Sequence, residues 1–237
     1  SLIDRSNRTC KKTIVSIFVN PKQFNNKKDF KNYPTNIKED IKILKKTKKV
    51  DFLYIPKFKD IYNNNKKSNI KIAKKDKVLC AKYREGHFEG VLDVMGRLTN
   101  LVNPKKIFMG KKDYQQYFLI KNYLKNKYKT SIIPCKTIRN KSKIALSSRN
   151  NHLDLNGIKK ASFLSKSLIK LKKNLANSKK IKQNLRIQMK YFEKFLKIKI
   201  EYLELRSIKN LKISNTVRDS RLFVAYYIDN VRLIDNF

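Results

Sequence analysis

The stretch that decides the fold is IFMGKKDYQQ at residues 107–116. Three apolar residues, a glycine and a polar cluster lead into apolar side chains at helical spacing, which predicts a strand, a tight turn and a helix. A glycine at the end of a strand lets the backbone approach a ligand closely. The helix that follows points unpaired N–H groups and a positive dipole end at the same place. The stretch therefore suits a phosphate, although many strand–helix corners carry a glycine and surface lysines without binding one.

Strands and helices alternate around this corner. The β-branched run at 13–19 predicts a strand buried on both faces, and further strands are predicted at 50–55 and 131–134. Helical periodicity begins after Asn36 and after Glu89. The order predicts an α/β fold with a Rossmann-like, doubly wound parallel sheet that binds ligands beyond the carboxyl ends of its strands. The side chains expected along that rim are Asn20, Gln23, Gly110, Lys112 and Asp113.

The composition changes after Asn150, where lysine-rich helical patterns precede strand patterns. The helical patterns cover about 159–174 and 178–197, and the strand patterns cover 200–206, 222–228 and 231–234. Helices followed by strands are typical of a small α+β domain with an antiparallel sheet. We therefore predict a Rossmann-like domain at 1–150 and a smaller α+β domain at 151–237.

The chain is strongly basic, with 58 Lys and Arg against 18 Asp and Glu and a formal charge of +40. Such a charge is typical of proteins that bind polyanions. The lysines are nevertheless spread along the whole chain among many Asn and Ile residues, as an A/T-rich coding sequence would produce. No arginine-rich tract or zinc-finger spacing accompanies them. We therefore expect no specific nucleic acid partner.

Cysteine and histidine usage limits the chemistry. The 3 cysteines lie far apart without a Cys-x-x-Cys pair, which argues against a disulfide framework or a zinc site and fits a reducing compartment. The 2 histidines, His87 and His152, offer little material for a metal site or a Ser-His-Asp triad. His87 precedes a predicted helix, and both packing in the core and ligand contact are open for it. No apolar run reaches the ~20 residues that span a membrane, so we predict a cytoplasmic protein with no membrane contact and no metal site.

ALSSRN at residues 145–150 is a second segment suited to a nucleotide. A triphosphate would fit this segment, which offers two hydroxyls and consecutive backbone N–H groups. Its arginine could donate two hydrogen bonds to phosphate oxygens. A short Ser-Ser-Arg also occurs by chance, so the segment alone decides nothing.

Taken jointly, the motifs resemble the pantothenate synthetase (pantoate–β-alanine ligase) family of the nucleotidyltransferase superfamily along essentially the whole chain. The matching stretches are SIFVNPKQF (16–24), NYPTNIKEDI (32–41), REGHFEGV (84–91), NLVNP (100–104), GKKDYQQ (110–116), ALSSRN (145–150), YLELR (202–206) and RLIDN (232–236). Their order and spacing together are highly specific.

The resemblance implies an ATP-dependent ligase that condenses pantoate with β-alanine through a pantoyl adenylate and releases AMP and pyrophosphate. It implies that Gln23 and Gln116 hold pantoate, that Lys112 faces the ATP phosphates and that Asp113 faces the ribose. It also implies an adenine pocket lined by Ile138, Mg²⁺ carried on the ATP phosphates, and a homodimer. The full set of ATP-binding residues that it implies is Gly110, Lys111, Lys112, Asp113, Ile138, Leu146, Ser147, Ser148 and Arg149, the last four forming a flexible phosphate clamp.

The chain departs from the family pattern in three places. The family's catalytic HxGH motif would lie just before Ser1, so we expect no catalytic residue in this chain and an N-terminally incomplete, inactive protein as given. Lys111 stands where the family has Glu, and Glu85 where it has Pro. Ser142-Lys143 replaces an Asp-Gly before the clamp, which we expect to stiffen or redirect that loop.

An alternative of a different class is a degenerate nucleotide-fold protein that binds RNA or other polyanions through its basic surface. It predicts basic side chains clustered on one face, salt-dependent RNA binding and a degraded sequence upstream of Ser1. An intact His-x-Gly-His upstream would favour the ligase instead.

Overall fold

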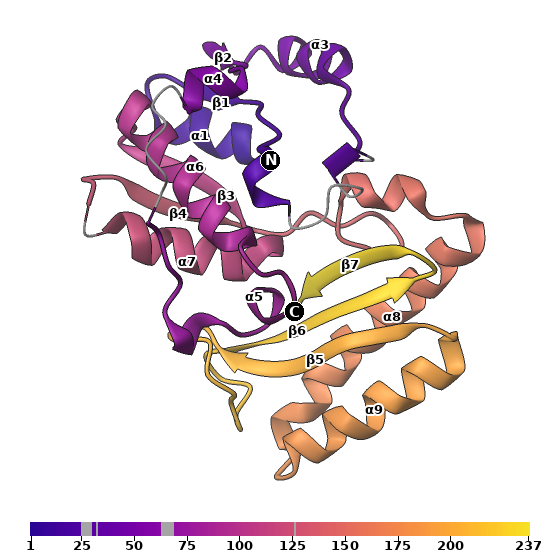
Figure 1. Ribbon diagram of the computed structural model, residues 1–237. Coiled ribbons are helices and arrows are strands. Elements are labelled where there is room, and N and C mark those ends of the chain that lie inside the picture. Colours follow the sequence, from indigo (N-terminus) through magenta and orange to yellow (C-terminus); the bar gives the residue numbers. More distant parts are fainter. Residues whose placement is uncertain (25–29, 32, 63–68, 126) are drawn as a thin grey trace. The chain divides into compact units, whose positions relative to one another are not determined.

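The computed structural model describes residues 1–24, 30–31, 33–62, 69–125 and 127–237. These residues form two compact units, unit 1 (Ser1–Lys136) and unit 2 (Thr137–Phe237) (Figure 1). The division comes earlier than the boundary near residue 150 that the composition predicts. The reason is that the intervening segment packs with unit 2, where Ile144 joins the hydrophobic core and Arg139 forms an ion pair with Asp235.

Helices and strands alternate along unit 1, as the sequence predicts. In chain order the elements are α1 (Leu2–Thr9), β1 (Ile14–Ser16), η1 (Pro21–Gln23), α3 (Ile37–Thr47), β2 (Phe52–Tyr54), α4 (Phe58–Ile61), η2 (Lys74–Asp76), α5 (Cys80–Tyr83), α6 (His87–Val102), β3 (Lys106–Gly110), η3 (Lys111–Asp113), α7 (Tyr114–Lys125) and β4 (Ser131–Cys135).

The strands of unit 1 pair in parallel, β1 with β2 and β3 with β4. Parallel pairing across intervening helices confirms the α/β prediction. The prediction that the first strand is buried on both faces is wrong, because Ile14 and Ser16 are exposed and Val15 is only half-buried. The strand is 3 residues long and, among the described residues, its pairing partner is β2 alone, so little of the chain covers it.

Two long helices, α6 and α7, carry much of the buried surface of unit 1. Before α6, Gly86 adopts a left-handed φ of +74°, and after it Asn103 does the same at +46°, immediately before Pro104. Left-handed backbone cannot belong to a right-handed helix, so Gly86 lies outside the start of α6; at the other end, left-handed Asn103 and the proline after it stop the helix. Phe88 and Val91 of α6 and Ile120 and Leu124 of α7 are buried.

Unit 2 is the predicted α+β unit. Its elements are η4 (Ser148–His152), α8 (Leu155–Asn174), η5 (Leu175–Asn177), α9 (Ile181–Leu196), β5 (Lys199–Ser207), β6 (Ser220–Ile228) and β7 (Val231–Asn236). The strands form an antiparallel sheet in the order β5-β6-β7.

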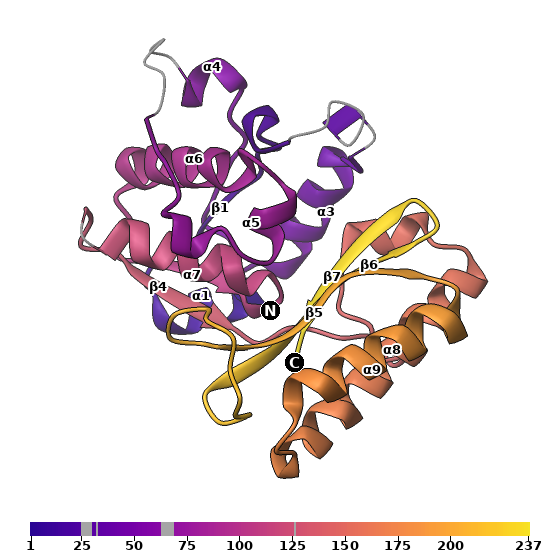
Figure 2. The ribbon, with the colours of Figure 1, turned by 60° about the horizontal axis from the view of Figure 1, so that its bottom comes forward.

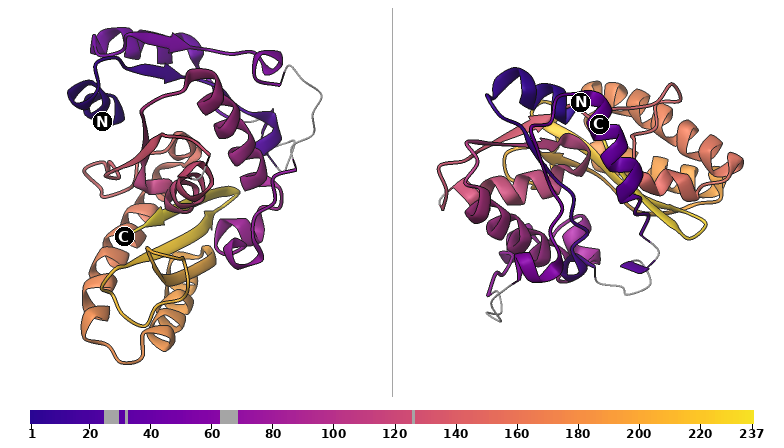
Figure 3. Two further views of the ribbon diagram at one scale, coloured as in Figure 1. Left: turned by 90° about the vertical axis from the view of Figure 1, so that its left-hand side faces the viewer. Right: turned by 90° about the horizontal axis from the view of Figure 1, so that it is seen from above.

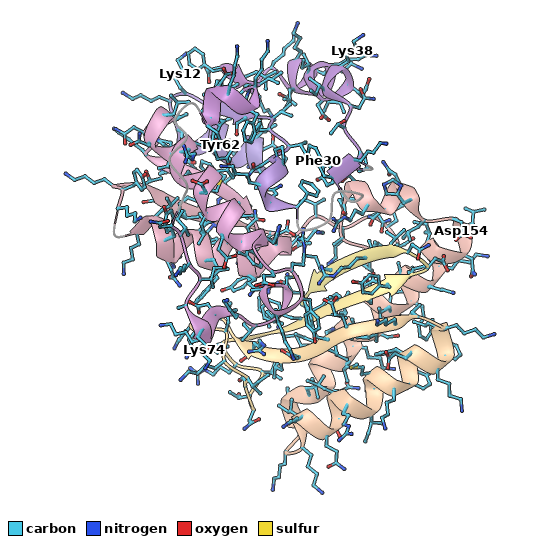
Figure 4. The ribbon with its side chains drawn as sticks, in the orientation of Figure 1. Lys12, Phe30, Lys38, Tyr62, Lys74 and Asp154 are labelled. Carbon is cyan, nitrogen blue, oxygen red and sulfur yellow. The ribbon has the colours of Figure 1, made fainter. Side chains whose placement is uncertain are left out.

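The helices α8 and α9 lie side by side on one face of this sheet (Figures 1 and 2), and Figure 3 shows the same packing from two further directions. Leu168 of α8, Phe192 of α9 and Val224 of β6 belong to one buried core. The start of α8 is capped by Asp154, labelled in Figure 4, whose Oδ1 accepts a hydrogen bond from Gly157 N at 2.6 Å.

Lysines occupy several backbone positions that favour glycine. Lys48 ends α3 with φ +51°, Lys197 ends α9 with φ +50°, and Lys143 turns the chain before the 145–150 segment with φ +68°. Residues with a Cβ enter this left-handed region less readily than glycine. Lys143 stands at the expected glycine position, yet the turn is closed by hydrogen bonds from Lys143 N to Asn140 O and from Asn140 N to Ile144 O, both 3.0 Å.

Candidate active site

The corner at 107–116 forms as predicted, with β3 ending at Gly110, the turn η3 following and α7 beginning at Tyr114. Gly110 has an ordinary φ of −71°, and the structure describes no atom within 4 Å of the position that a Cβ would take. Neither backbone strain nor neighbouring protein atoms therefore require glycine here. The space in front of Gly110 is open for a ligand that approaches the backbone closely.

A cation and a carboxylate stand together at this corner. Lys112 Nζ donates to Asp113 Oδ1 at 3.3 Å, and the side chains are 19% and 47% exposed. Both lie at the start of α7, where the helix dipole attracts negative charge. The half-exposed Asp113 carboxylate can also accept hydrogen bonds from a ligand, which suits the predicted ribose contact.

Two consecutive glutamines of α7 differ in what surrounds them. Gln116, predicted to hold pantoate, is half-buried. Gln115 is buried, and its Nε2 donates to the carbonyls of Val78 at 2.6 Å and Asp76 at 3.3 Å. Gln115 Oε1 is buried without a hydrogen-bond partner in the described structure. Gln115 thus anchors the 76–79 segment to the first turn of α7, a role that the sequence did not indicate because the contact joins distant segments.

Asn20 braces the loop that carries Gln23. Its Oδ1 accepts hydrogen bonds from Lys22 N at 3.2 Å and from Tyr62 Oη at 3.1 Å, while its Nδ2 donates to Gly90 O at 3.1 Å. Asn20 is 1% exposed. Its amide therefore serves the protein's own loop geometry, whereas the half-buried Gln23 lies at the end of the turn η1.

Tyr62 connects this loop to α6 (Figure 4). Lys22 Nζ lies 4.0 Å from the centroid of its ring and Arg97 Cζ lies 4.7 Å from it, both within cation–π distance. Burial, followed by the negative charge of Asp93, raises the pKa of Tyr62 to about 12. Tyr62 is accordingly a neutral hydrogen-bond donor to Asn20 at physiological pH.

His87 is engaged by protein atoms at both ring nitrogens. Nδ1 lies 2.6 Å from Gln23 O, and Nε2 lies 2.9 Å from Arg84 Nη1. The residue is buried and packs edge-on against Phe88, with ring centroids 4.7 Å apart. Of the two roles that the sequence left open, packing within the protein accounts for both nitrogens.

The predicted nucleotide residues of unit 2 begin on a hairpin. Leu146 N donates to Ile138 O at 3.0 Å, beside the bridge between Arg139 and Ala145. The side chains of Ile138 and Leu146 remain 52% and 55% exposed. The structure therefore brings the predicted adenine contact next to the first residue of the predicted clamp, with apolar surface available to a flat ligand.

The rest of the predicted clamp is a short helical turn. Ser147 Oγ caps η4 by accepting from Arg149 N at 3.3 Å, and Asn150 Nδ2 donates to Ala145 O at 2.9 Å. Ser148 is exposed and Arg149 is half-buried. A hydroxyl and a guanidinium on such a turn can both donate to phosphate oxygens.

The described residues contain no group of three or more His, Cys, Asp or Glu side chains that could hold a metal ion. None of the described helices is both long and apolar enough to cross a membrane. Cys10, Cys80 and Cys135 carry free thiols, and the last two are buried.

A sequence model of the family described as "Pantoate-beta-alanine ligase" matches residues 1–237. The chain belongs to the pantoate–β-alanine ligase family. It is 35% identical to the pantothenate synthetase of Sulfurihydrogenibium sp. (strain YO3AOP1), over 100% of this chain and 85% of that relative.

Solved structures agree with this assignment. The pantothenate synthetase of Thermus thermophilus matches with a TM-score of 0.92 and 28% identity, covering 100% of this chain and 86% of that one. The pantoate–β-alanine ligase of Francisella tularensis, solved in complex with beta-gamma ATP and β-alanine, matches with a TM-score of 0.84 and 36% identity over 100% of this chain and 82% of that one. The resemblance and the α/β fold read from the sequence are confirmed, and the comparisons give no support to the RNA-binding alternative.

Proposed function

We propose that this chain condenses pantoate with β-alanine at the expense of ATP. In the first half-reaction a carboxylate oxygen of pantoate attacks the α-phosphorus of ATP and pyrophosphate leaves. In the second, the amine of β-alanine attacks the acyl carbon of pantoyl adenylate, loses a proton and displaces AMP. The observation that carries the proposal is the family match over residues 1–237, supported by a fold shared with a relative solved with beta-gamma ATP and β-alanine.

Unit 1 supplies the acid site and part of the nucleotide site in this proposal. The amides of Gln23 and Gln116 donate to the oxygens of pantoate and accept from its hydroxyls. Gly110 and Lys111 let the nucleotide approach the backbone at the end of β3. Lys112 neutralises phosphate charge, and Asp113 accepts hydrogen bonds from the ribose hydroxyls.

Unit 2 supplies the remaining nucleotide contacts. Ile138 and Leu146 lie on one hairpin and offer exposed apolar surface to the adenine. Ser147, Ser148 and Arg149 donate to the phosphates. No protein nucleophile is needed, because the rate enhancement comes from holding the two reactants together and from donors aimed at charge that develops on the α-phosphate.

Magnesium enters this proposal with the nucleotide. By the resemblance, Mg²⁺ would ride on the ATP phosphates. It would offset phosphate charge beside Lys112 and Arg149.

Several finer features are proposed from the resemblance. Unit 1 forms a Rossmann-like, doubly wound domain that binds ATP and pantoate. The protein works as a homodimer in the cytoplasm.

Pantoate-dependent exchange of labelled pyrophosphate into ATP by the full-length protein tests the proposal. Exchange is expected with pantoate alone, and pantothenate is expected when β-alanine is added. Gln116→Ala should weaken exchange through a higher KM for pantoate. Lys121→Ala, an exposed position on the same helix, is the matched control. Exchange with another acid but none with pantoate would reject the substrate assignment.

A further inference from the structure

We infer that His87, as the neutral tautomer with its proton on Nδ1, is a positioning residue that sets the acid-binding Gln23. The inference rests on the proposed function for the role of Gln23, but the geometry that carries it does not. In this role His87 does not touch the substrate and acts through the backbone carbonyl of Gln23.

Gln23 lies where regular secondary structure cannot hold it. It is the last residue of η1, a turn of 3 residues. So short a turn has little stability of its own, and its position depends on contacts with other elements. Two of those contacts come from α6, at Gly90 and at His87.

The first contact is steric. Gly90 lies in α6 directly under the loop, and a Cβ at that position would stand 2.3 Å from Lys22 O and 2.9 Å from Gln23 Cα. The backbone of the loop therefore approaches the helix more closely than a residue with a Cβ would allow. Asn20 Nδ2 reinforces this contact by donating to Gly90 O at 3.1 Å.

The second contact is the imidazole of His87, one turn earlier on α6. Its Nδ1 lies 2.6 Å from Gln23 O. A carbonyl oxygen only accepts hydrogen bonds, so Nδ1 must carry a proton. This bond fixes the carbonyl end of the residue whose side chain is proposed to hold pantoate.

Arg84 determines the state of the other nitrogen. Its Nη1 lies 2.9 Å from His87 Nε2, and a guanidinium only donates. Nε2 must therefore present its lone pair. One protonation state satisfies both neighbours, namely the neutral ring protonated at Nδ1, since imidazolium would point an N–H at the guanidinium. Arg84 thus selects the tautomer that holds Gln23.

Kinetics of the full-length enzyme separate positioning from general stability. His87→Phe keeps the ring and its packing on Phe88 but cannot donate to Gln23 O, and it should raise the KM for pantoate about tenfold, the worth of one lost hydrogen bond. The KM for ATP should stay within about twofold. His87→Asn restores an N–H near the Nδ1 position and should recover part of the pantoate KM. Tyr191→Phe, which removes a polar group from an exposed ring of α9 while keeping the ring, is the control.

A second measurement uses the chain without substrate. ¹⁵N chemical shifts of the wild-type imidazole should show protonated Nδ1 and unprotonated Nε2 at neutral pH. The inference is overturned if the ring is protonated at Nε2, or if His87→Phe changes the KM values for ATP and pantoate equally. A full-length enzyme that never activates pantoate would sink the proposed function, while the tautomer would still report on the geometry. If His87→Phe fails to fold, His87→Asn and the wild-type spectrum decide the matter.

Discussion

Replacing Gly90 by alanine is the sharpest perturbation that the structure offers. The added Cβ would lie 2.3 Å from Lys22 O and 2.7 Å from Lys22 C. Both are backbone atoms that cannot rotate away as a side-chain tip can. Non-bonded heavy atoms pack ~3.5 Å apart, so residues 20–24 would have to move away from α6 by about 1 Å.

The free energy of this change is the sum of opposing effects. Forcing a methyl into a packed contact costs roughly 1–3 kcal/mol. Moving the loop would also weaken the hydrogen bonds from Asn20 to Gly90 O and from His87 to Gln23 O, at about 1 kcal/mol each. In the opposite direction, alanine stabilises a helix interior by up to ~1 kcal/mol relative to glycine. We expect Gly90→Ala to lower the free energy of unfolding by about 2–4 kcal/mol.

Gly96→Ala in the same helix is the matched control. Its Cβ would lie 3.2 Å from Tyr123 Oη and 3.3 Å from Tyr123 Cε1, at the movable end of a half-buried side chain. The gain in helix propensity should offset most of that crowding, leaving stability within about 1 kcal/mol of wild type. Urea titrations followed by far-ultraviolet circular dichroism measure both variants. Equal stability of Gly90→Ala and Gly96→Ala would refute the proposed contact between loop and helix.

Three further predictions concern a turn, an ion pair and a tyrosine. Lys143→Gly should raise the thermal midpoint, because it relieves roughly 1 kcal/mol of left-handed strain, whereas Lys141→Gly in the same turn should not. Asp235→Asn should lower the free energy of unfolding by ~3 kcal/mol, because it breaks a buried ion pair. Arg139 donates two hydrogen bonds to the Asp235 carboxylate, at 2.6 and 2.8 Å, and the Asp235 side chain is 5% exposed. A urea titration that shows no loss of stability would contradict this prediction. The raised pKa of Tyr62 stabilises the fold fully below its unfolded pKa of ~10, and this contribution is lost as pH rises through about 12. Tyr62→Phe should therefore flatten the alkaline fall in stability, and an unchanged slope in urea titrations over that pH range would contradict it.

The sequence predicts local structure well where the signals are local. The corner at 107–116, the two long helices of unit 2 and the antiparallel strands that follow them are confirmed, because the corner carries its own glycine and the elements of unit 2 show clear hydrophobic periodicity. The motifs also predict the pantoate–β-alanine ligase family correctly, because their order and spacing are specific even though each motif is short.

The features that could not be predicted from the sequence depend on contacts between residues far apart in the chain. The exposure of Ile14 depends on what lies beside β1, and a β-branched run cannot report that. The division at Lys136 depends on the pairing of Arg139 with Asp235, almost a hundred residues later. The contact of His87 with Gln23 joins positions 64 apart, so sequence alone left a packing role and a ligand role equally open. The roles of the substrate residues themselves remain predictions.

The lysines in left-handed backbone have a consequence for the stability of this chain. With 5 glycines in 237 residues, it is poorer in glycine than the ~7% of ordinary proteins. Lys48, Lys143 and Lys197 hold turns that glycine would hold with less strain. These turns therefore combine a left-handed backbone with side chains poorly matched to it. Each such site is an opportunity for thermostabilisation by a single substitution outside the predicted substrate contacts.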